Sequence, residues 1–190
     1  MIIYKEVDEA YFDMYDRIPM LVHVKSKFIL VKSKNGLGGI LLEEVPVDCY
    51  IKNLGLYEEA KKYKENFDIT NWAFFMAFDD KIPIGAATVV SKTSNVQMLD
   101  GRDDLSVLWD IRIDDRYKYQ GVGTTLFKMA VEWSKSKGLK QMKIESQNDN
   151  VPGCRFYHKQ GAVLGKIDEY AYYKETELND EVQLIWYLDL

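Results

Sequence analysis

The sequence predicts one mixed α/β domain, and three observations support that fold class. Strand-like segments dominate the first part of the chain, whereas strands and helices alternate from residue 105 onward. Residues 105–138 have the pattern of a strand, a glycine-containing loop and a helix. The length of 190 residues is enough for one hydrophobic core, and no repeat, linker or low-complexity tract divides the chain. We therefore expect a single domain with a mixed sheet flanked by helices.

Composition argues against several classes of protein. The chain is 47% hydrophobic and 29% charged, which is ordinary for a soluble globular protein. It has no apolar run long enough to cross a bilayer, and its start, MIIYKEVDEA, lacks a signal-peptide profile. Two cysteines and two histidines without ligand-like spacing predict neither a disulfide framework nor a metal site. The net charge of −5 argues against nucleic acid as a partner. We expect a cytoplasmic protein without membrane contact.

The N-terminal third predicts short elements and one hairpin. Residues 1–7 favour a strand, and Asp8 is placed to cap a brief helix through Ile18. Residues 20–44 are rich in β-branched and apolar residues, broken by glycines at 35–39, which predicts two extended segments around a turn. That turn is either a mobile flap over a substrate or a plain hairpin connection.

The segments before residue 105 continue this pattern. Residues 56–67 have helical composition, with glutamates before lysines, which is typical of a solvated helical face. Residues 71–78 and 82–90 predict two antiparallel strands joined by a tight turn, and a polar loop follows them over 91–104. These strands lead directly into the central strand, loop and helix.

In the central strand, 105–113, apolar residues fall on every second position, with Asp110 and Arg112 between them. The apolar residues of this alternation are Leu105, Val107, Trp109, Ile111 and Ile113. The pattern predicts one strongly buried face and a largely polar opposite face. After the loop, apolar residues recur at helical spacing as far as Trp133, and Gly138 marks the expected end of the helix.

The C-terminal part adds a strand, a helix and two strands. Residues 141–147 alternate as a strand does, and a helix is expected from Asn150 to Gly161 with Pro152 in its first turn. Residues 162–167 and 181–188 predict the last two strands, with a charged turn over 174–180 between them.

The central glycine loop carries the strongest chemical signal. Gly121 and Gly123 directly precede the helix, so the backbone can approach a ligand closely. The first turn of a helix has amide hydrogens without an intrahelical partner, and these bind a phosphate or pyrophosphate well. The alternative is that both glycines only make a tight turn between strand and helix.

Two motifs resemble the GNAT superfamily of acetyl-CoA-dependent N-acetyltransferases. The first is the acyl-CoA loop Lys118-Tyr119-Gln120-Gly121-Val122-Gly123, and the second is the helix Asn150-Val151-Pro152-Gly153-Cys154-Arg155-Phe156-Tyr157-His158-Lys159-Gln160-Gly161. The resemblance covers roughly residues 72–190 and implies a mixed, mostly antiparallel sheet flanked by helices. Residues 145–150 and the closing Trp186-Tyr187 also resemble the streptothricin-acetyltransferase-like branch. Residues 71–190 are then the acetyl-CoA-binding core and residues 1–70 shape the acceptor site.

The resemblance implies where acetyl-CoA, the co-substrate, is held. Its pyrophosphate would lie on the backbone amides of Gln120, Gly121, Val122, Gly123 and Thr124. The backbone of Ile111 and Ile113 would pair with the pantetheine arm, and Asn150 would bind the arm further along. Lys118 stands where the family usually has Arg or Gln, so it keeps a charge but not a fork geometry. No metal is implied.

The resemblance also implies a direct attack of an amine on the thioester. An amine with a pKa near that of lysine is protonated at neutral pH, so a base must take its proton. Asp110 and Glu145, on neighbouring strands, are the candidates, directly or through water, although both could simply be solvated. The amide of Ile111 or Ile113 would stabilise the oxyanion, and Tyr157 would donate a proton to the thiolate.

Several alternatives remain open at this point. The expected acceptor is a primary amine of a small molecule, but a protein amino terminus or lysine is the alternative within the same chemistry. A non-catalytic acyl-CoA-binding module is the alternative from another class. A Cys154–His158 nucleophilic pair is unconvincing, because these side chains leave a helix in different directions. The protein is expected to be a monomer or a homodimer.

Overall fold

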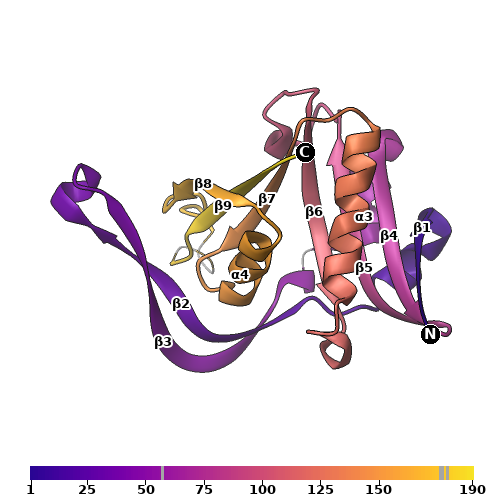
Figure 1. Cartoon of the computed structure of the whole chain (residues 1–190), viewed down its shortest axis with the longest axis horizontal. Helices are drawn as coiled ribbons and strands as arrows, with labels where there is room; N and C mark the ends of the chain where they lie inside the picture. The colour runs from indigo at the N-terminus through magenta and orange to yellow at the C-terminus, as the bar shows by residue number, and fades with distance from the viewer. Residues whose placement is uncertain (57, 176–177, 179) are drawn as a thin grey trace. The chain divides into compact units, whose positions relative to one another are not determined.

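A computed structural model of the chain describes residues 1–56, 58–175, 178 and 180–190 (Figure 1). The chain divides into two compact units. The first comprises Met1–Leu21, Asn53–Ile144 and Tyr187–Leu190, and the second comprises Val22–Lys52 and Glu145–Trp186. Both units therefore interleave segments that are distant in the sequence.

The sheet of the first unit is antiparallel except for its last pair of strands. The strands lie in the order β1 (Ile2–Val7), β4 (Trp72–Asp79), β5 (Ile82–Ser91), β6 (Leu105–Ile113) and β7 (Gln141–Gln147). Neighbouring strands pair antiparallel up to β6, which confirms the antiparallel strands predicted over 71–90. β6 and β7 pair in parallel from Leu105↔Gln141 to Leu108↔Ile144. The remaining residues of β6, Trp109–Ile113, extend beyond this parallel ladder.

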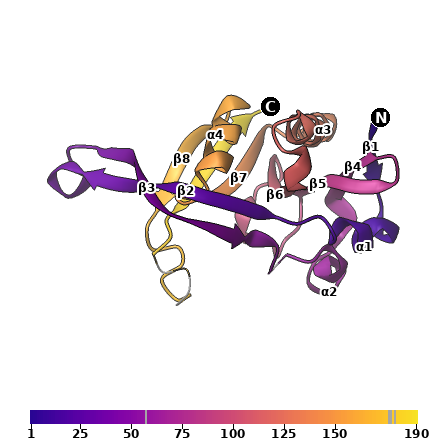
Figure 2. The same ribbon diagram turned by 90° about the horizontal axis from the view of Figure 1, so that it is seen from below.

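Helices lie on both faces of this sheet (Figure 2). α3 (Val122–Ser136) packs on β4, β5 and β6 and has the extent predicted from its apolar spacing. On the opposite face lie α1 (Phe12–Tyr15) and α2 (Tyr63–Asn66), which form a core with β4, β5 and β6. Aromatic rings supply much of that core, because Tyr63 and Phe74 contact each other and each also contacts both Phe12 and Trp72.

The helices before residue 70 are shorter than predicted. The helix expected through Ile18 is the 3-10 turn η1 (Glu9–Tyr11) followed by α1, although Asp8 does cap it by accepting a hydrogen bond from the Ala10 amide (3.0 Å). The helix expected over 56–67 is replaced by η4 (Ala60–Lys62) and α2. Tertiary contacts of the aromatic side chains, rather than helix propensity, hold these short pieces.

A β-bulge in β6 overturns the predicted alternation of that strand. Thr88 pairs with Asp110 and the next residue, Val89, pairs with Leu108, so Trp109 is the extra residue. One extra residue shifts every later side chain to the other face. Asp110 and Arg112 are consequently buried on the face that carries α1 and α2, whereas Ile111 and Ile113 are only half-buried.

Further short turns connect the elements of the first unit. They are η3 (Leu54–Leu56), η5 (Ile69–Asn71), η6 (Gln97–Leu99) and η7 (Asp115–Tyr117). η6 is the regular part of the polar loop predicted over 91–104. η7 leads from β6 into the glycine loop.

The second unit contains a hairpin and the C-terminal elements. The hairpin is β2 (Leu21–Lys32), the turn η2 (Ser33–Gly36) and β3 (Ile40–Asn53), which confirms two extended segments around a glycine turn. α4 (Val151–Lys159) and β8 (Val163–Asp168) follow, and β9 (Gln183–Asp189) lies between β7 and β8. The helix and the last two strands agree with the prediction. The turn predicted over 174–180 lies partly outside the described residues, at 176–177 and 179.

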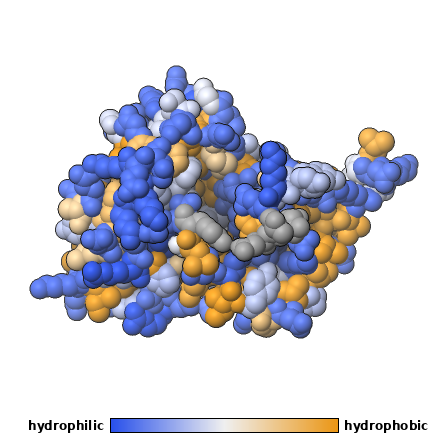
Figure 3. Space-filling view, turned by 180° about the vertical axis from the view of Figure 1, so that it is seen from behind, coloured by the Kyte–Doolittle hydropathy of each residue, from blue (hydrophilic) through white to orange (hydrophobic). Residues whose placement is uncertain are grey.

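The hairpin carries exposed apolar side chains, and Figure 3 shows hydrophobic atoms at its tip. They include Ile29, Val31, Leu37, Ile40 and Leu41. Hydrogen bonds hold the hairpin within its unit: the Phe28 amide donates to the Asn148 carbonyl, and the Asn148 side chain donates to the Phe28 carbonyl, both at 2.8 Å. In the described part of the chain no helix is long and apolar enough to span a membrane.

Candidate functional site

The glycine loop presents unpaired amides at the start of α3. Gly121 is the N-cap residue of the helix and has φ +87°, a left-handed conformation that glycine adopts without strain. The first intrahelical bond runs from the Thr125 amide to the Gly121 carbonyl (3.0 Å). The amides of Val122, Gly123 and Thr124 therefore have no intrahelical partner, and none of the side chains that the structure describes caps them. This chemistry fits the pyrophosphate of acetyl-CoA.

Lys118 was expected to contact phosphate through its side chain and Gln120 through its backbone amide, and both side chains already have protein partners. Lys118 Nζ donates to the Leu21 carbonyl and forms an ion pair with Asp115, both at 2.6 Å. Gln120 Nε2 donates to the Arg116 carbonyl at 2.6 Å. Both interactions tie the loop to itself and to the residues around it.

The end of β6 offers a strand edge beside this loop. Ile111 and Ile113 lie in Trp109–Ile113, the part of β6 that extends beyond the parallel ladder with β7. The Ile113 side chain lies on the face of the sheet that carries α3, because a Cβ atom built on Gly85 would come within 2.9 Å of Ile113 and 3.0 Å of Leu126 in that helix. Ile111, two residues earlier in the strand, points to the same face. An extended ligand can pair with such an edge as an added strand.

Asp110, one of the two predicted bases, is enclosed in an ion pair on the other face. Its exposed fraction is 2% and that of Arg112 is 3%. Arg112 Nε lies 2.9 Å from Asp110 Oδ2, and the terminal Nη2 nitrogen contacts the same oxygen. The guanidinium also lies over the ring of Tyr15 (5.0 Å) and donates to the carbonyl of Glu58 (3.2 Å). Burial lowers the pKa of Arg112, but Asp110 outweighs this effect and the pKa ends above its usual range.

Glu58 lies beside this ion pair, and sequence reasoning did not single it out. It was expected on a solvated helical face, but it is half-buried and accepts hydrogen bonds from Trp109 Nε1 (3.1 Å) and from the Tyr63 hydroxyl (3.2 Å). Burial, and then the charge of Asp110, raise the pKa of this carboxyl above its ordinary value. Glu58 and Trp109 are 51 residues apart, so no local pattern could reveal their contact.

Three other predicted residues belong to the second unit. Glu145, the other candidate base, accepts hydrogen bonds from the Tyr172 hydroxyl on one oxygen and from Gln183 Nε2 (2.9 Å) on the other. Asn150 caps α4, with its side-chain oxygen accepting from the Gly153 amide at 3.0 Å. Tyr157 lies buried on α4.

The structure does not support a nucleophilic Cys154. Its thiol is buried and lies 3.3 Å from Ser146 Oγ, whereas His158 is exposed. Burial raises the pKa of the thiol to about 11, so the reactive thiolate is scarce at neutral pH. Cys154 and Cys49 are both free cysteines.

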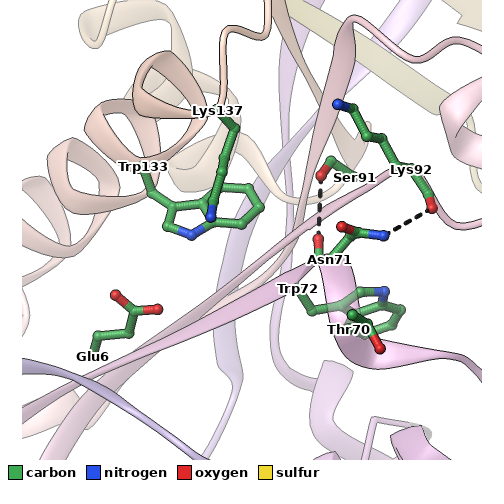
Figure 4. Close-up of a pocket in the computed structure, with 8 residues that line it drawn as sticks. All are labelled: Glu6, Thr70, Asn71, Trp72, Ser91, Lys92, Trp133 and Lys137. Atoms are coloured by element: carbon green, nitrogen blue, oxygen red, sulfur yellow. Dashed lines mark hydrogen bonds between the residues drawn. The ribbon is translucent and has the colours of Figure 1, made fainter.

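A cavity of about 240 Å³ lies at the far end of α3 (Figure 4). Its wall includes Trp133 and Lys137, whose Nζ lies 5.5 Å from the Trp133 ring. Helix geometry places Trp133 roughly 18 Å from Gly121 along the axis. None of the predicted site residues lines this cavity, so it is not the predicted cofactor site. Within the described residues, no group of three or more His, Cys, Asp or Glu residues could hold a metal ion.

Comparison with known proteins identifies relatives that are named as acetyltransferases. The family model of the acetyltransferase (GNAT) family matches residues 36–162. Streptothricin acetyltransferase of Escherichia coli is 28% identical over 109 residues, which are 57% of this chain and 63% of that protein. Streptothricin acetyltransferase A of Bacillus subtilis is 32% identical over 82 residues, 43% of this chain and 47% of that protein. The match thus spans less than two thirds of either relative.

A solved structure matches over the whole length. It is that of a candidate streptothricin acetyltransferase from Bacillus anthracis in complex with acetyl coenzyme A. Its TM-score is 0.80 at 25% sequence identity, and the match covers 100% of both chains. The mixed, mostly antiparallel fold predicted from the sequence is therefore confirmed.

Proposed function

The chain belongs to the GNAT acetyltransferase family, and on that premise we propose that it transfers the acetyl group of acetyl-CoA to a primary amine of a small molecule. The observation that carries this proposal is the start of α3, where the amides of Val122, Gly123 and Thr124 are uncapped. The solved relative with acetyl coenzyme A supports the choice of co-substrate.

In the proposed complex, backbone groups hold the co-substrate. The amides from Gln120 to Thr124 bind the pyrophosphate, because the helix terminus supplies both donors and a favourable dipole. The backbone of Ile111 and Ile113 pairs with the pantetheine arm, and Asn150 binds the arm further along. Lys118 contributes little directly, because Asp115 already neutralises its charge.

The proposed reaction is a direct attack of the neutral amine on the thioester carbonyl. An amide of Ile111 or Ile113 donates to the developing oxyanion, and Tyr157 donates its hydroxyl proton to the leaving sulfur. Asp110 and Glu145 were the predicted proton acceptors. Both carboxylates already accept hydrogen bonds from protein donors, so either would act through water or after a partner moves.

For the acceptor we propose a cationic antibiotic of the streptothricin type. The support is the name of the matched relatives and the net charge of −5, which favours cationic ligands over anionic ones. A protein amino terminus or lysine is the competing acceptor, and both acceptors use the same transfer chemistry.

The test is acetyl-CoA-dependent thiol release against a panel of amines: streptothricin, an aminoglycoside, a polyamine and short peptides. We expect saturable turnover with streptothricin, and a Tyr157→Phe variant that binds acetyl-CoA but turns over roughly 100-fold more slowly. Tyr170→Phe is the matched control, because Tyr170 is 74% exposed. Turnover with peptides alone would favour a protein acceptor. Binding of acetyl-CoA without any thiol release would favour a non-catalytic module.

A further inference from the structure

We propose that Glu58 is a catalytic residue of this acetyl transfer, and that its carboxylate binds the ammonium group of the acceptor and removes one of its protons. The proposal rests on the proposed function, because it takes acetyl-CoA binding along β6 and α3 as its starting point. Its further content is the identity of the base and the position of the acceptor amine.

The proposed acetyl-CoA site directs the acetyl group toward Trp109. The pyrophosphate site at the start of α3 follows the C-terminal end of β6 in the chain. An arm that pairs with β6 from Ile113 and then Ile111 runs toward earlier residues, and the next position along this course is the bulge at Trp109. The indole Nε1 of Trp109 donates a hydrogen bond to Glu58 Oε2 (3.1 Å). Glu58 therefore lies beside the bulge toward which the proposed arm directs the acetyl group.

One oxygen of Glu58 is available to a ligand. The bonds from Trp109 and from Tyr63 both end on Oε2, and among the described residues none is recorded on Oε1. The described part of the chain also has no fully buried side-chain oxygen or nitrogen that lacks a partner. Together with the half-buried position of Glu58, this indicates that the described residues do not fully enclose Oε1. The two donors on Oε2 hold the carboxylate in place while Oε1 faces an incoming group.

The charges around Glu58 favour a cation. Asp110 and Arg112 of β6 face Glu58, and their charges neutralise each other. Tyr63 of α2 donates a hydrogen bond to the Glu58 carboxylate. Asp16, which follows α1, accepts a hydrogen bond (2.7 Å) from the backbone amide of Ala60, and Ala60 is two residues after Glu58 in the chain. Among these described neighbours, the only cation is Arg112, and it is paired with Asp110 rather than with the Glu58 carboxylate. An ammonium ion is the ligand that complements it.

The direction of the pKa shift of Glu58 suits a general base. Burial and then the charge of Asp110 raise its pKa above the ordinary value, which makes the carboxylate a stronger base. Asp110 and Glu145 lack this combination, because their oxygens already accept hydrogen bonds from Arg112 in one case and from Tyr172 and Gln183 in the other.

The proton balance of the reaction is complete with this assignment. The acceptor enters with three hydrogens on nitrogen, and Glu58 takes the first as the neutral amine forms. Nitrogen then forms a bond to the carbonyl carbon and the carbon–sulfur bond breaks. A second proton leaves the nitrogen for solvent as the amide forms, and Tyr157 gives its hydroxyl proton to the thiolate and takes one back from solvent. Glu58 returns its proton to solvent, so the net products are the amide, the thiol and one proton.

The test compares Glu58→Gln with the matched control Glu65→Gln, since Glu65 is an exposed glutamate of α2. The acceptor is the amine of the panel with the highest kcat/KM in the wild-type protein. We expect Glu58→Gln to lose at least 100-fold in kcat/KM for this amine, while acetyl-CoA binding by calorimetry changes less than twofold. We expect Glu65→Gln to match the wild type in both.

The pH dependence separates a base from a structural residue. The loss in Glu58→Gln should shrink as the pH approaches the pKa of the acceptor amine, because the amine is then neutral without a base. A loss that is equal at every pH, or one below threefold, would overturn the assignment. If Glu58→Gln does not fold, Glu58→Asp applies, with at least a tenfold loss and the same pH trend. Absence of turnover by the wild type with every amine would instead overturn the proposed function and this inference with it.

Discussion

The buried Asp110–Arg112 ion pair predicts a large stability loss when one partner is removed. Arg112→Met leaves the Asp110 carboxylate, which is 2% exposed, without a counter-ion in the core. Breaking a buried pair in this way costs about 3–5 kcal/mol of unfolding free energy. The carbonyl of Glu58 also loses the donor that lies 3.2 Å away. With a total stability of about 5–15 kcal/mol for a typical domain, such a loss is easily measured.

The same chain supplies a matched control. Arg116 pairs with Asp114 across the same two-residue spacing, but its side chain is 72% exposed. An exposed pair of this kind contributes about 0–1 kcal/mol. Arg116→Met should therefore change the unfolding free energy by less than about 1 kcal/mol.

The assay is urea unfolding followed by tryptophan fluorescence for Arg112→Met, Asp110→Asn, Arg116→Met and the double variant Asp110→Leu/Arg112→Met. The double variant should be more stable than Arg112→Met alone, because no charge remains unpaired. If Arg112→Met costs no more than Arg116→Met, the argument from burial is wrong. If Asp110→Asn keeps its stability but loses turnover, Asp110 acts in catalysis rather than in the core.

Three further predictions concern two glycines, the two cysteines and Glu58. Gly121→Ala and Gly138→Ala both place alanine at positive φ and should each lose about 1–2 kcal/mol in urea unfolding, but only Gly121→Ala should weaken acetyl-CoA binding in calorimetry. Ellman's reagent should label exposed Cys49 quickly and buried Cys154 only after unfolding, while Cys154→Ser should retain turnover; two equally fast thiols would contradict the burial. Because its raised pKa makes ionised Glu58 unfavourable in the folded state, protonation stabilises folding below the ordinary value of 4.5, and this contribution is lost as the pH rises through the folded-state pKa. The stability of Glu58→Gln relative to wild type should thus improve from pH 4 to pH 7, and a trend in the opposite direction would refute the shift.

The placement of Glu58 shows why part of the site could not be predicted. The glutamates and lysines of 56–67 have the composition of a solvated helix, and local composition was the only information available there. Tyr63 and Trp109 are buried in or against the same aromatic core, and both donate to Glu58. The contact depends on packing between segments that are far apart in the chain, so it has no local signature.

The hairpin over 22–52 illustrates the opposite case. Its β-branched residues and glycine turn are local signals, and the structure has the predicted pair of strands. β3 nevertheless continues through Pro46 to Asn53, where the sequence pattern is hard to assign. Proline is tolerated in a strand only where its missing amide is not needed, and that depends on the neighbouring strand.

The sequence by itself determined the order of elements after residue 71, the extent of α3 and α4, the glycine loop and the family. These features depend on periodicity, capping residues and short motifs, which act over a few residues. Only the tertiary structure decided the faces of β6, because a single bulge at Trp109 buries Asp110 and Arg112 and turns Ile111 and Ile113 toward α3. The physical reason is that strand alternation has a period of two, so one extra residue reverses every side chain that follows.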